Sequence, residues 1–514
     1  MSLNRSHSSP YFEARSLAVN GTLKVRWHDR LGVTPSAFPT DIDLADKVEG
    51  MLLGLAIGDS LGNTSESMNP IDRANAHGWI SDYLPNRNAL GRRVGLPSDD
   101  TQLAFWTVEQ LTRDERLEPQ LLGNAFCRHR IYGLGSATRE FLGQFKAGTP
   151  WSCSGSASAG NGALMRIAPV LLPYLRRSNC DLWADTLLAA HLTHNDELSN
   201  TSCVAMVHML WQLISMTEAP TRGWWIEQWL AVIDDLSLDG SGSVYTSRNG
   251  HPPNFKGSAA ELIRRYVVPA LDQNMGVVEA GSVWHSGAYL LETVPTVLYI
   301  LSRFGGDPRE AILQAVNHTR DNDTIAAIVG AAVGALHGAS SLPRAWVDSL
   351  LGRTRGDDDH RVFELLAAAG DRFGYGVTQG TRERAALRAS SADVRAELQR
   401  AIATPDLGQV IDLGQSGRWI KIVEFLQQNW AVILPTESGT GVRLWFFDDG
   451  FNVFDLIELA DVATAQRSLR RNGFEPYTES KHGFVASPVP HEKSPRFSWR
   501  PRPIYSTGEF WITQ

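Results

Sequence analysis

Hydrophobic residues recur at helical spacing through most of the chain between Leu44 and about residue 372. The pattern is clearest in four stretches: Ala45–Leu61, Thr101–Thr112, Glu279–Arg303 and Thr324–Leu336. Apolar side chains three and four positions apart lie on one face of a helix and are typical of helices that pack on a core. The pattern therefore predicts an all-α main domain over residues 45–372.

The residues before and directly after this domain show a different pattern. Residues 1–44 lack sustained helical periodicity and contain polar and proline-bearing patches, with one strand-like stretch at Gly21–Trp27. They are expected to form an N-terminal extension. In residues 373–410, the stretch Thr381–Thr404 is rich in Arg, Ala and Glu at helical spacing, which predicts a helical linker.

Residues 411–514 combine helical and strand-like patterns. Arg418–Gln428 predicts an amphipathic helix, and Trp430–Pro435 and Val442–Phe447 predict two strands. The polar, glycine-containing residues 437–441 between the strands indicate a hairpin. A second helix, Ala460–Asn472, and an aromatic, proline-rich tail through Tyr505 and Trp511 complete a small C-terminal α+β domain of unknown role.

Composition narrows the class of protein. The length of 514 residues favours more than one folding unit. Lys and Arg total 48 against 56 for Asp and Glu, so the chain lacks the basic balance of a nucleic-acid-binding protein. The amino terminus has no unbroken apolar stretch of a secretory signal, and the longest apolar run, Ile325–Leu336, is about half the roughly 20 residues that span a bilayer. These features predict a cytoplasmic protein with no membrane or nucleic-acid partner.

The cysteines also indicate a cytoplasmic protein. Cys127, Cys153, Cys180 and Cys203 stand singly, without the paired spacing of a zinc site or the density of a disulfide scaffold. We expect reduced thiols in a reducing compartment.

Glycine recurs every four residues in two of the predicted helices. The first series is Gly50, Gly54, Gly58 and Gly62, and the second is Gly330, Gly334 and Gly338, preceded one turn earlier by Ala326. Each series lies on one helix face, and each glycine costs about 1 kcal/mol relative to alanine. Chance in a glycine-rich chain is the simpler explanation. Close approach of the two backbones is the stronger one, and it would bring Asp59 and residues 321–324 toward one site.

Two acidic clusters stand at predicted helix starts. They are Ser98-Asp99-Asp100-Thr101 and Asp321-Asn322-Asp323-Thr324. An N-cap role accounts for one residue in each cluster but not for paired carboxylates twice, and Asp-Asp-Thr by itself is a common string. Magnesium prefers oxygen ligands in near-octahedral geometry, and a pair of ions would fit so many carboxylates. The clusters therefore indicate a divalent-metal site.

Six motifs in order resemble the ADP-ribosylglycohydrolase family, which includes ADP-ribosylarginine hydrolases and the dinitrogenase reductase-activating glycohydrolase. The resemblance covers about residues 45–372. Its motifs are Gly50 to Gly62 with Glu66, Pro97 to Gln102, Gly160 to Arg166, Leu192-Thr-His194, Glu292-Thr-Val-Pro295 and Asp321 to Ile325. Each string is weak alone, but six in register are specific.

The resemblance implies an all-α ADP-ribosylglycohydrolase-like main domain that binds two Mg²⁺ ions, with Mn²⁺ able to substitute. Its metal ligands carry over to Ser98, Asp99, Asp100, Asp321, Asp323 and Thr324. Its substrate-binding residues carry over to Ser158, Gly160, Asn161, Gly162 and His194. Asn161 could instead be only a turn residue and His194 only a loop histidine. Glu66 matches a glutamate on a mobile loop beside the metals.

Two positions depart from the family pattern. Ser98 replaces the usual threonine, which keeps the hydroxyl and should preserve metal coordination. His318-Thr-Arg320 replaces a usual pair of glycines, so the backbone near the second acidic cluster is expected to differ. This second departure bears on substrate preference more than on metal binding.

The resemblance predicts a hydrolase that removes ADP-ribose from a modified side chain, with arginine as the first choice of linkage. Glu66 and Asp100 are both candidates for proton transfer, and the sequence does not choose between them. The expected partner is an ADP-ribosylated protein, with an ADP-ribosyltransferase toxin as a further partner if the protein gives immunity. The alternatives are an immunity protein that blocks a toxin through residues 1–44, and a magnesium phosphoesterase acting on a nucleotide.

Overall fold

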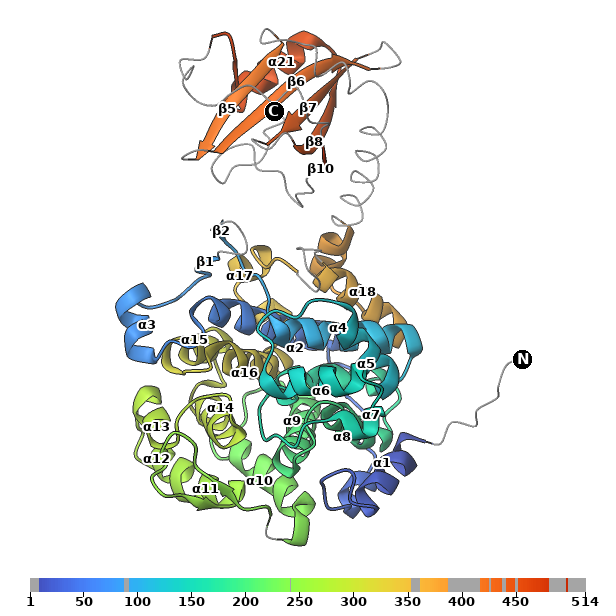
Figure 1. Ribbon diagram of the computed structural model, residues 1–514, viewed down its shortest axis with the longest axis vertical. Coiled ribbons are helices and arrows are strands. Elements are labelled where there is room, and N and C mark those ends of the chain that lie inside the picture. The colour runs from blue at the N-terminus through green and yellow to red at the C-terminus, as the bar shows by residue number, and fades with distance from the viewer. Residues whose placement is uncertain are drawn as a thin grey trace, which may run out of the picture. The chain divides into compact units, whose positions relative to one another are not determined.

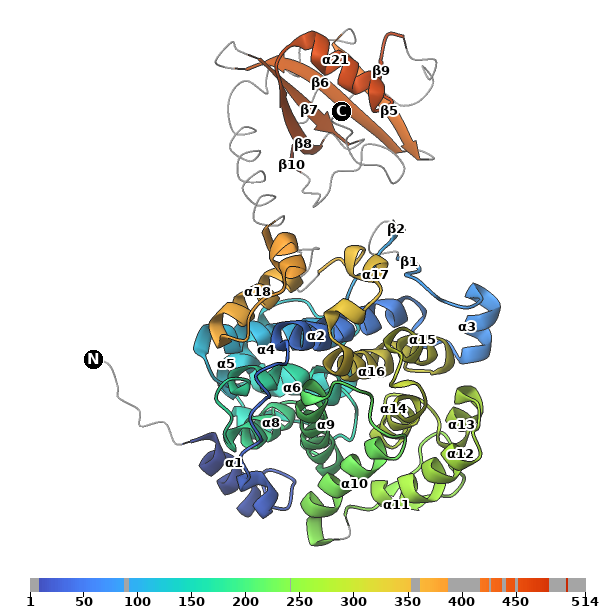
Figure 2. The same cartoon turned by 180° about the vertical axis from the view of Figure 1, so that it is seen from behind.

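The protein folds into two compact units that divide between Ala385 and Ala386. The computed structural model describes residues 9–86, 92–240, 242–352, 361–386, 417–424, 427–436, 441–448, 452–479 and 496–497. The first unit is built of helices and the second around a β-sheet (Figures 1 and 2). The predicted fold class, an all-α main domain with a small C-terminal α+β domain, is confirmed.

The helices of the first unit surround one hydrophobic core. They are α1 (Pro10–Val19), α2 (Leu44–Gly62), α3 (Pro70–His77), α4 (Asp99–Asp114), α5 (Pro119–Arg128), α6 (Ser136–Lys146), α7 (Trp151–Ser154), α8 (Asp181–His191), α9 (Glu197–Ser215), α10 (Trp224–Leu236), α11 (Ala259–Leu262), α12 (Val268–Asp272), α13 (Val277–Trp284), α14 (Leu290–Phe304), α15 (Pro308–His318), α16 (Asn322–His337), α17 (Arg344–Asp348) and α18 (Arg361–Phe373). Two short pairs, β1 (Pro85–Asn86) with β2 (Arg92–Arg93) and β3 (Tyr245–Thr246) with β4 (Lys256–Gly257), are antiparallel. Among the described residues, no helix is both long enough and apolar enough to cross a membrane.

Helices α2 and α16 lie side by side at the centre of this unit (Figures 1 and 2). A Cβ atom added to Gly54 would lie 2.1 Å from the Gly330 carbonyl oxygen, and one added to Gly50 would lie 2.4 Å from that of Gly334. Gly58 faces Ala326 in the same way. The contacting residues rise in number along α2 and fall in number along α16, so the two helices run antiparallel. The predicted close approach is confirmed, and it brings the end of α2 to the start of α16.

The N-terminal residues differ from the prediction in two ways. Pro10–Val19 forms helix α1, whose N-cap Ser9 donates to Asp181 Oδ1 at 2.6 Å. The strand predicted at Gly21–Trp27 is wrong, because no ladder forms there. This stretch does bury Leu23 and Val25 in the core, so its alternating pattern reflects burial without strand pairing.

The stretch predicted to be helical at Glu279–Arg303 forms two helices. Residues 285–289 separate α13 from α14, and His285 adopts a positive φ of 64° that ends the first helix. Ser286 in this break accepts the backbone N–H groups of Arg320 and Asp321 through its carbonyl oxygen, at 3.2 and 2.9 Å. The break therefore supports the segment that leads into α16.

The second unit is a six-stranded sheet covered on one face by a helix. Its strands and helix are β5 (Arg418–Glu424), β6 (Gln427–Pro435), β7 (Val442–Phe447), β8 (Asn452–Leu459), α21 (Val462–Arg471), β9 (Glu475–Pro476) and β10 (Arg496–Phe497). The strand order is β10-β8-β7-β6-β5-β9, with β10 parallel to β8 and the other neighbours antiparallel. Leu469 of α21 packs on Trp419 and Phe446.

Two predictions for this unit are confirmed and one is wrong. The hairpin is β6 paired with β7, and the predicted helix at Ala460–Asn472 is α21. The helix predicted at Arg418–Gln428 is instead strand β5 with the start of β6. Of the predicted linker helix, residues 379–386 are helical. Its remainder and the aromatic tail lie outside the described residues.

Candidate active site

Asp59, near the end of α2, anchors the first acidic cluster. Its carboxylate accepts the backbone N–H of Ser98 at 2.8 Å and that of Thr101 at 3.2 Å. It also accepts the hydroxyl groups of both residues, each at 2.5 Å, and Nδ2 of Asn63 at 2.9 Å. The carboxylate is fully buried, so these donors replace water around its charge. Asp59 thereby fixes the start of α4 against the end of α2.

The two acidic clusters stand at the N-termini of α4 and α16, as predicted, but their N-cap residues do not cap. Ser98 makes no side-chain capping bond, because its hydroxyl donates to Asp59. Asp321 makes none either, because its carboxylate accepts Nδ2 of Asn161 at 2.6 Å. The N-cap explanation of these residues is therefore wrong, and both side chains are directed into one site.

Carboxylates from the two clusters, together with Asp59 and Glu66, form two groups that share Asp323. In the first group, one oxygen each of Asp59, Asp100 and Asp323 lie within 4.8 Å of one another. In the second group, oxygens of Glu66, Asp321 and Asp323 lie within the same distance. Oδ1 of Asp100 is buried and has no hydrogen-bond partner among the described residues. An orphaned carboxylate oxygen in an acidic cluster suits a cation ligand.

The carboxylates of the site repel one another. Burial, followed by the charges of Asp59 and Asp99, raises the pKa of Asp100 well above its usual range. Burial, followed by the charges of Asp321 and Asp100, does the same for the pKa of Asp323. A divalent cation would offset both the lost hydration and the repulsion. The residues present therefore fit the metal site that the sequence predicts.

The other predicted ligands lie around these groups. Asp99 is 7% exposed, and burial with the charge of Asp59 raises its pKa well above the usual range. The Thr324 hydroxyl donates to Met165 Sδ at 3.9 Å. The hydroxyl oxygens of Ser98 and Thr324 keep a lone pair for a cation while their hydrogens are bound elsewhere. Their roles as ligands stay predictions.

Glu66, a member of the second group, is an exposed residue of a turn. Loss of hydration, then the charges of Asp321 and Asp59, raise its pKa to about 7. Arg73 of α3, which is fully buried, fixes this turn. Its guanidinium donates to Ser65 Oγ at 3.1 Å, to the Met68 carbonyl at 2.9 Å and to the Thr319 carbonyl at 2.6 Å. Arg73 therefore ties the turn that carries Glu66 to the segment before Asp321.

Asn161 lies between the predicted substrate loop and the metal groups. Besides its bond to Asp321, its Nδ2 donates to Thr293 Oγ1 at 3.1 Å, and its backbone N–H donates to the Ala288 carbonyl at 3.1 Å. Asn161 is thus more than a turn residue, since it couples the loop to a predicted ligand. Gly160 forms an isolated bridge with Tyr289, and its N–H donates to Ser158 Oγ at 3.2 Å.

His194 is packed against the same loop. A Cβ atom added to Gly162 would lie 2.9 Å from His194 Cε1, so the absence of a side chain there admits the ring. Burial, with the charge of Arg166, lowers the pKa of His194 to about 3. The structure therefore brings Ser158, Gly160, Gly162 and His194 together.

Residues 318–320, which stand where the family usually has a pair of glycines, make specific contacts. The His318 ring packs edge-on against Trp79 with centroids 5.3 Å apart, and the Thr319 carbonyl accepts Arg73. The Arg320 side chain is exposed, and its positive charge helps to lower the pKa of neighbouring His285 to about 4, after burial. The segment therefore adds a cation beside Asp321.

Three residues of this site were not among those predicted from the sequence. Asp59 was placed near the site by the glycine spacing but was not identified as a ligand. Arg73 had no sequence signal, because its bonds join segments distant in the chain. Glu292 lay in a recognised motif without an assigned role. It is 2% exposed, and burial raises its pKa to about 7.

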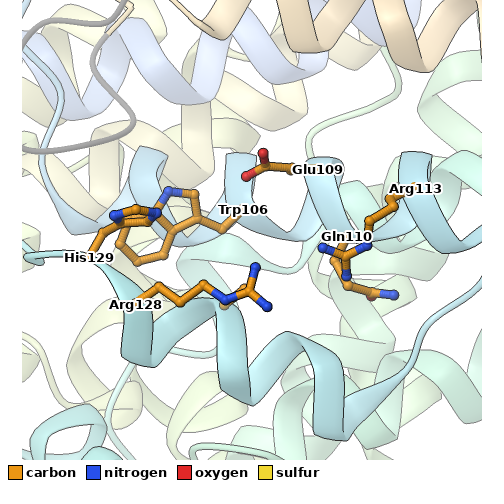
Figure 3. Close-up of a pocket in the computed structure, with 7 residues that line it drawn as sticks. Trp106, Glu109, Gln110, Arg113, Arg128 and His129 are labelled. Atoms are coloured by element: carbon orange, nitrogen blue, oxygen red, sulfur yellow. The ribbon is translucent and has the colours of Figure 1, made fainter.

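A separate small pocket lies between α4 and α5 (Figure 3). Trp106, Glu109, Arg113 and Arg128 are among its lining residues, and its volume is about 30 Å³. Trp106 follows Asp99 by seven residues, about 10 Å along the helix axis. The pocket therefore lies apart from the acidic groups.

Comparison with known proteins places the first unit of the chain in a family. The family model described as ADP-ribosylglycohydrolase matches residues 40–374. The chain is 26% identical to the ADP-ribosyl-dinitrogen reductase glycohydrolase of Rhodospirillum rubrum, over 63% of the chain and 97% of that relative. It is 27% identical to the ADP-ribosylarginine hydrolase Tri1 of Pseudomonas putida, over 59% of the chain and 74% of that relative.

A solved structure described as an ADP-ribosylglycohydrolase-related protein complex is also similar. It aligns with a TM-score of 0.47 and 24% identity, covering 65% of the chain and 99% of that structure's chain. The match of the family model to more than half of the sequence confirms the resemblance inferred from six motifs. The chain belongs to the ADP-ribosylglycohydrolase family.

Proposed function

We propose that this ADP-ribosylglycohydrolase is magnesium-dependent and releases ADP-ribose from modified arginine side chains of proteins. The observation that carries the proposal is the pair of carboxylate groups that share Asp323 at the N-termini of α4 and α16. The similarity to a relative named as an ADP-ribosylarginine hydrolase supports arginine as the linkage.

Two magnesium ions would be held by the carboxylates of the two groups. Asp59, Asp100 and Asp323 would hold one, and Asp321 and Asp323 the other, with Asp99, Ser98 and Thr324 as neighbouring oxygen donors. When bound, the ions would orient ribose hydroxyls and supply positive charge to polarise a water molecule. Mn²⁺ prefers the same oxygen ligands and would substitute.

Glu66 is the better candidate for proton transfer and Asp100 for metal binding. Glu66 is exposed, so it reaches both substrate and solvent, and a pKa of about 7 lets it exchange a proton near neutral pH. Asp100 is 1% exposed and its carboxylate lies close to those of Asp59 and Asp323, a buried acidic environment that suits a cation. In hydrolysis, the bond from the anomeric carbon to the guanidine nitrogen breaks, that nitrogen gains a proton, and water supplies the hydroxyl to the sugar. Glu66 would transfer a proton between water and the leaving nitrogen.

The loop of residues 158–162 would orient the substrate. Asn161 holds Asp321 through one amide hydrogen, so it fixes the loop at a set distance from the second carboxylate group. Such positioning lowers the entropy lost on reaching the transition state. The remaining loop groups, Ser158, Gly160 and Gly162, would contact ADP-ribose beside His194.

Immunity to an ADP-ribosyltransferase toxin is the biological role that we propose for this activity, in the cytoplasm of the producing cell. Enzymatic reversal is favoured over blocking by residues 1–44. The structure uses much of that segment internally, since Trp183 Nε1 donates to the Val33 carbonyl at 2.7 Å and Trp211 Nε1 to the Ser36 carbonyl at 2.9 Å.

The decisive experiment offers three substrates to the purified chain. These are proteins carrying arginine-linked, serine-linked and nucleobase-linked ADP-ribose, each with Mg²⁺ or with excess chelator. The proposal expects free ADP-ribose from the arginine linkage in Mg²⁺ alone. Release of phosphate would instead identify a phosphoesterase, and release only from another linkage would reassign the substrate.

A further inference from the structure

Arg166, Thr193 and His194 form a buried chain of hydrogen bonds beside the substrate loop. Arg166 Nη2 donates to Thr193 Oγ1 at 2.7 Å and to the Ala189 carbonyl at 3.0 Å. Thr193 Oγ1 lies 2.9 Å from His194 Nδ1. The exposed fractions are 1%, 0% and 2% for Arg166, Thr193 and His194. Protein groups, not bulk water, therefore decide which atom donates in each bond.

The direction of these bonds follows from the chemistry of the groups. A guanidinium has only donors, so Thr193 Oγ1 accepts from Arg166. The single hydroxyl hydrogen of Thr193 then has one recorded acceptor within the described part of the chain, His194 Nδ1. Leaving that hydrogen unpaired in a buried position would be unfavourable. A ring nitrogen that accepts carries no proton, so the neutral imidazole carries its proton on Nε2.

The Nε2 atom lies beside two glycines of the substrate loop. A Cβ atom added to Gly160 would lie 3.4 Å from His194 Nε2 and 3.3 Å from Ser158 Oγ. One added to Gly162 would lie 3.2 Å from the same Nε2. Because Ser158 Oγ already accepts the Gly160 N–H, its own hydrogen is available to donate. An N–H and an O–H donor thus lie on the same side of Gly160.

We infer that Arg166 and Thr193 are positioning residues that hold His194 in its Nε2–H tautomer, so that the ring presents a hydrogen-bond donor to the ADP-ribose that the substrate loop is proposed to bind. The choice of ligand rests on the proposed function, whereas the tautomer does not. Diphosphate oxygens only accept hydrogen bonds, so the opposite tautomer would present a lone pair to an anion. Neutrality of the ring agrees with its lowered pKa.

Nitrogen NMR of the full chain with ¹⁵N-labelled histidine tests the tautomer. The chain has 14 histidines, and loss of one signal in His194→Gln assigns His194. The expected spectrum shows a protonated Nε2 and an unprotonated, hydrogen-bonded Nδ1 without any ligand. Thr193→Val should shift the Nδ1 resonance toward that of a nitrogen without a hydrogen bond, and Thr193→Ser should restore it. A protonated Nδ1 in the unaltered chain would overturn the inference, whatever the activity.

Calorimetric titration with ADP-ribose in Mg²⁺ tests the ligand contact. A glutamine amide can replace Nε2 as a donor, whereas an asparagine amide reaches only the position of Nδ1. His194→Asn should therefore bind ADP-ribose about tenfold more weakly than His194→Gln, with circular dichroism confirming that both fold. Equal affinities for the two variants would overturn the contact. Absence of ADP-ribose binding to the unaltered chain would overturn the contact and the proposed function together, while the tautomer result would stand.

Discussion

Gly54 of α2 and Gly330 of α16 face each other so closely that a Cβ atom on either would lie 2.1 Å from the carbonyl oxygen of the other. Neither helix can shift freely, because the same contact recurs at Gly50 with Gly334 and at Gly58 with Ala326. We predict that Gly54→Ala lowers the free energy of unfolding by about 3 kcal/mol or more, since backbone atoms must separate. Thermal and denaturant unfolding of the full chain measure this loss.

Gly143→Ala is the matched control. Gly143 also lies within a helix, α6, but a Cβ atom there meets nothing within 4 Å. Alanine at this position should leave stability unchanged or raise it by up to about 1 kcal/mol. An equal loss in both variants would mean that the effect at Gly54 does not come from helix contact.

The acidic groups predict a pH-dependent effect of metal removal. In the metal-free protein, several carboxyl groups have a higher pKa in the folded state than in the unfolded state, including Glu66 at about 7. Each such group stabilises the folded state at a pH below its unfolded pKa. This stabilisation is lost as the pH rises through its folded pKa. Chelated protein should therefore melt at progressively lower temperature from about pH 5 to about pH 8. Magnesium should restore both stability and hydrolysis, with the larger thermal shift at the higher pH.

The double variant with Asp100→Asn and Asp323→Asn is the control for this pH dependence of the melting temperature. Removing two of the mutually repelling carboxylates should flatten the decline in melting temperature of the chelated protein. If magnesium shifted the melting temperature of this double variant as much as that of the unaltered chain, the ion would bind elsewhere.

Asp59 and Asp323 should differ in their effect on activity. Asp323 belongs to both carboxylate groups, so Asp323→Ala should lower hydrolysis by several orders of magnitude. Asp59→Asn keeps the shape of the side chain but cannot accept all the hydrogen bonds from Ser98 and Thr101, so we expect a loss of about 10- to 100-fold or more. Exposed Asp41→Asn is the control. Full activity in Asp59→Asn would remove Asp59 from the site.

Arg73 should act through Glu66. Arg73→Lys keeps the charge but cannot reach Ser65, Met68 and Thr319 together, so the Glu66 turn should lose its fixed position. We expect kcat to fall on the order of a hundredfold. In a double-mutant cycle, Arg73→Lys should have little further effect on Glu66→Gln. Additive losses would show that Arg73 supports the fold generally, and exposed Arg344→Lys should be neutral.

Much of the main domain and the location of the acidic clusters could be predicted from the sequence, because the patterns that indicate them are local in the chain. Glycine every fourth residue gave the contact between α2 and α16, and paired aspartates at helix starts indicated a metal site. Asp59 and Arg73 could not be identified in the same way. Their roles depend on hydrogen bonds to Ser98 and Thr319, which are 39 and 246 residues away in the chain.

Strand β5 was mistaken for a helix because both of its faces are buried. Trp419 packs under α21 on one face of the sheet, whereas the next residue, Ile420, packs on the other face. Because the two faces are both apolar, the sequence does not alternate: Arg418, Lys421 and Glu424 recur every third position and leave pairs of apolar residues between them, a spacing that imitates a helix over a short window.

The boundary of the catalytic unit gives the last prediction. All predicted site residues lie before residue 325, and the core of the first unit shares no residue with those of the second. A chain ending at Ala386 should therefore remain folded and hydrolytically active.

A chain ending at Val377 should not remain folded and active, because Thr378 and Thr381 donate to the carboxylate of Glu49, which lies fully buried in α2. Without these donors Glu49 would be an unpaired buried charge, and α2 carries Asp59. Replacing Glu49 with glutamine in the Val377 chain removes that charge and should recover part of the lost stability, measured by thermal unfolding. If the two shortened chains melted at the same temperature, the residues after Val377 would be dispensable, and if the Ala386 chain were inactive, the second unit would be part of the enzyme.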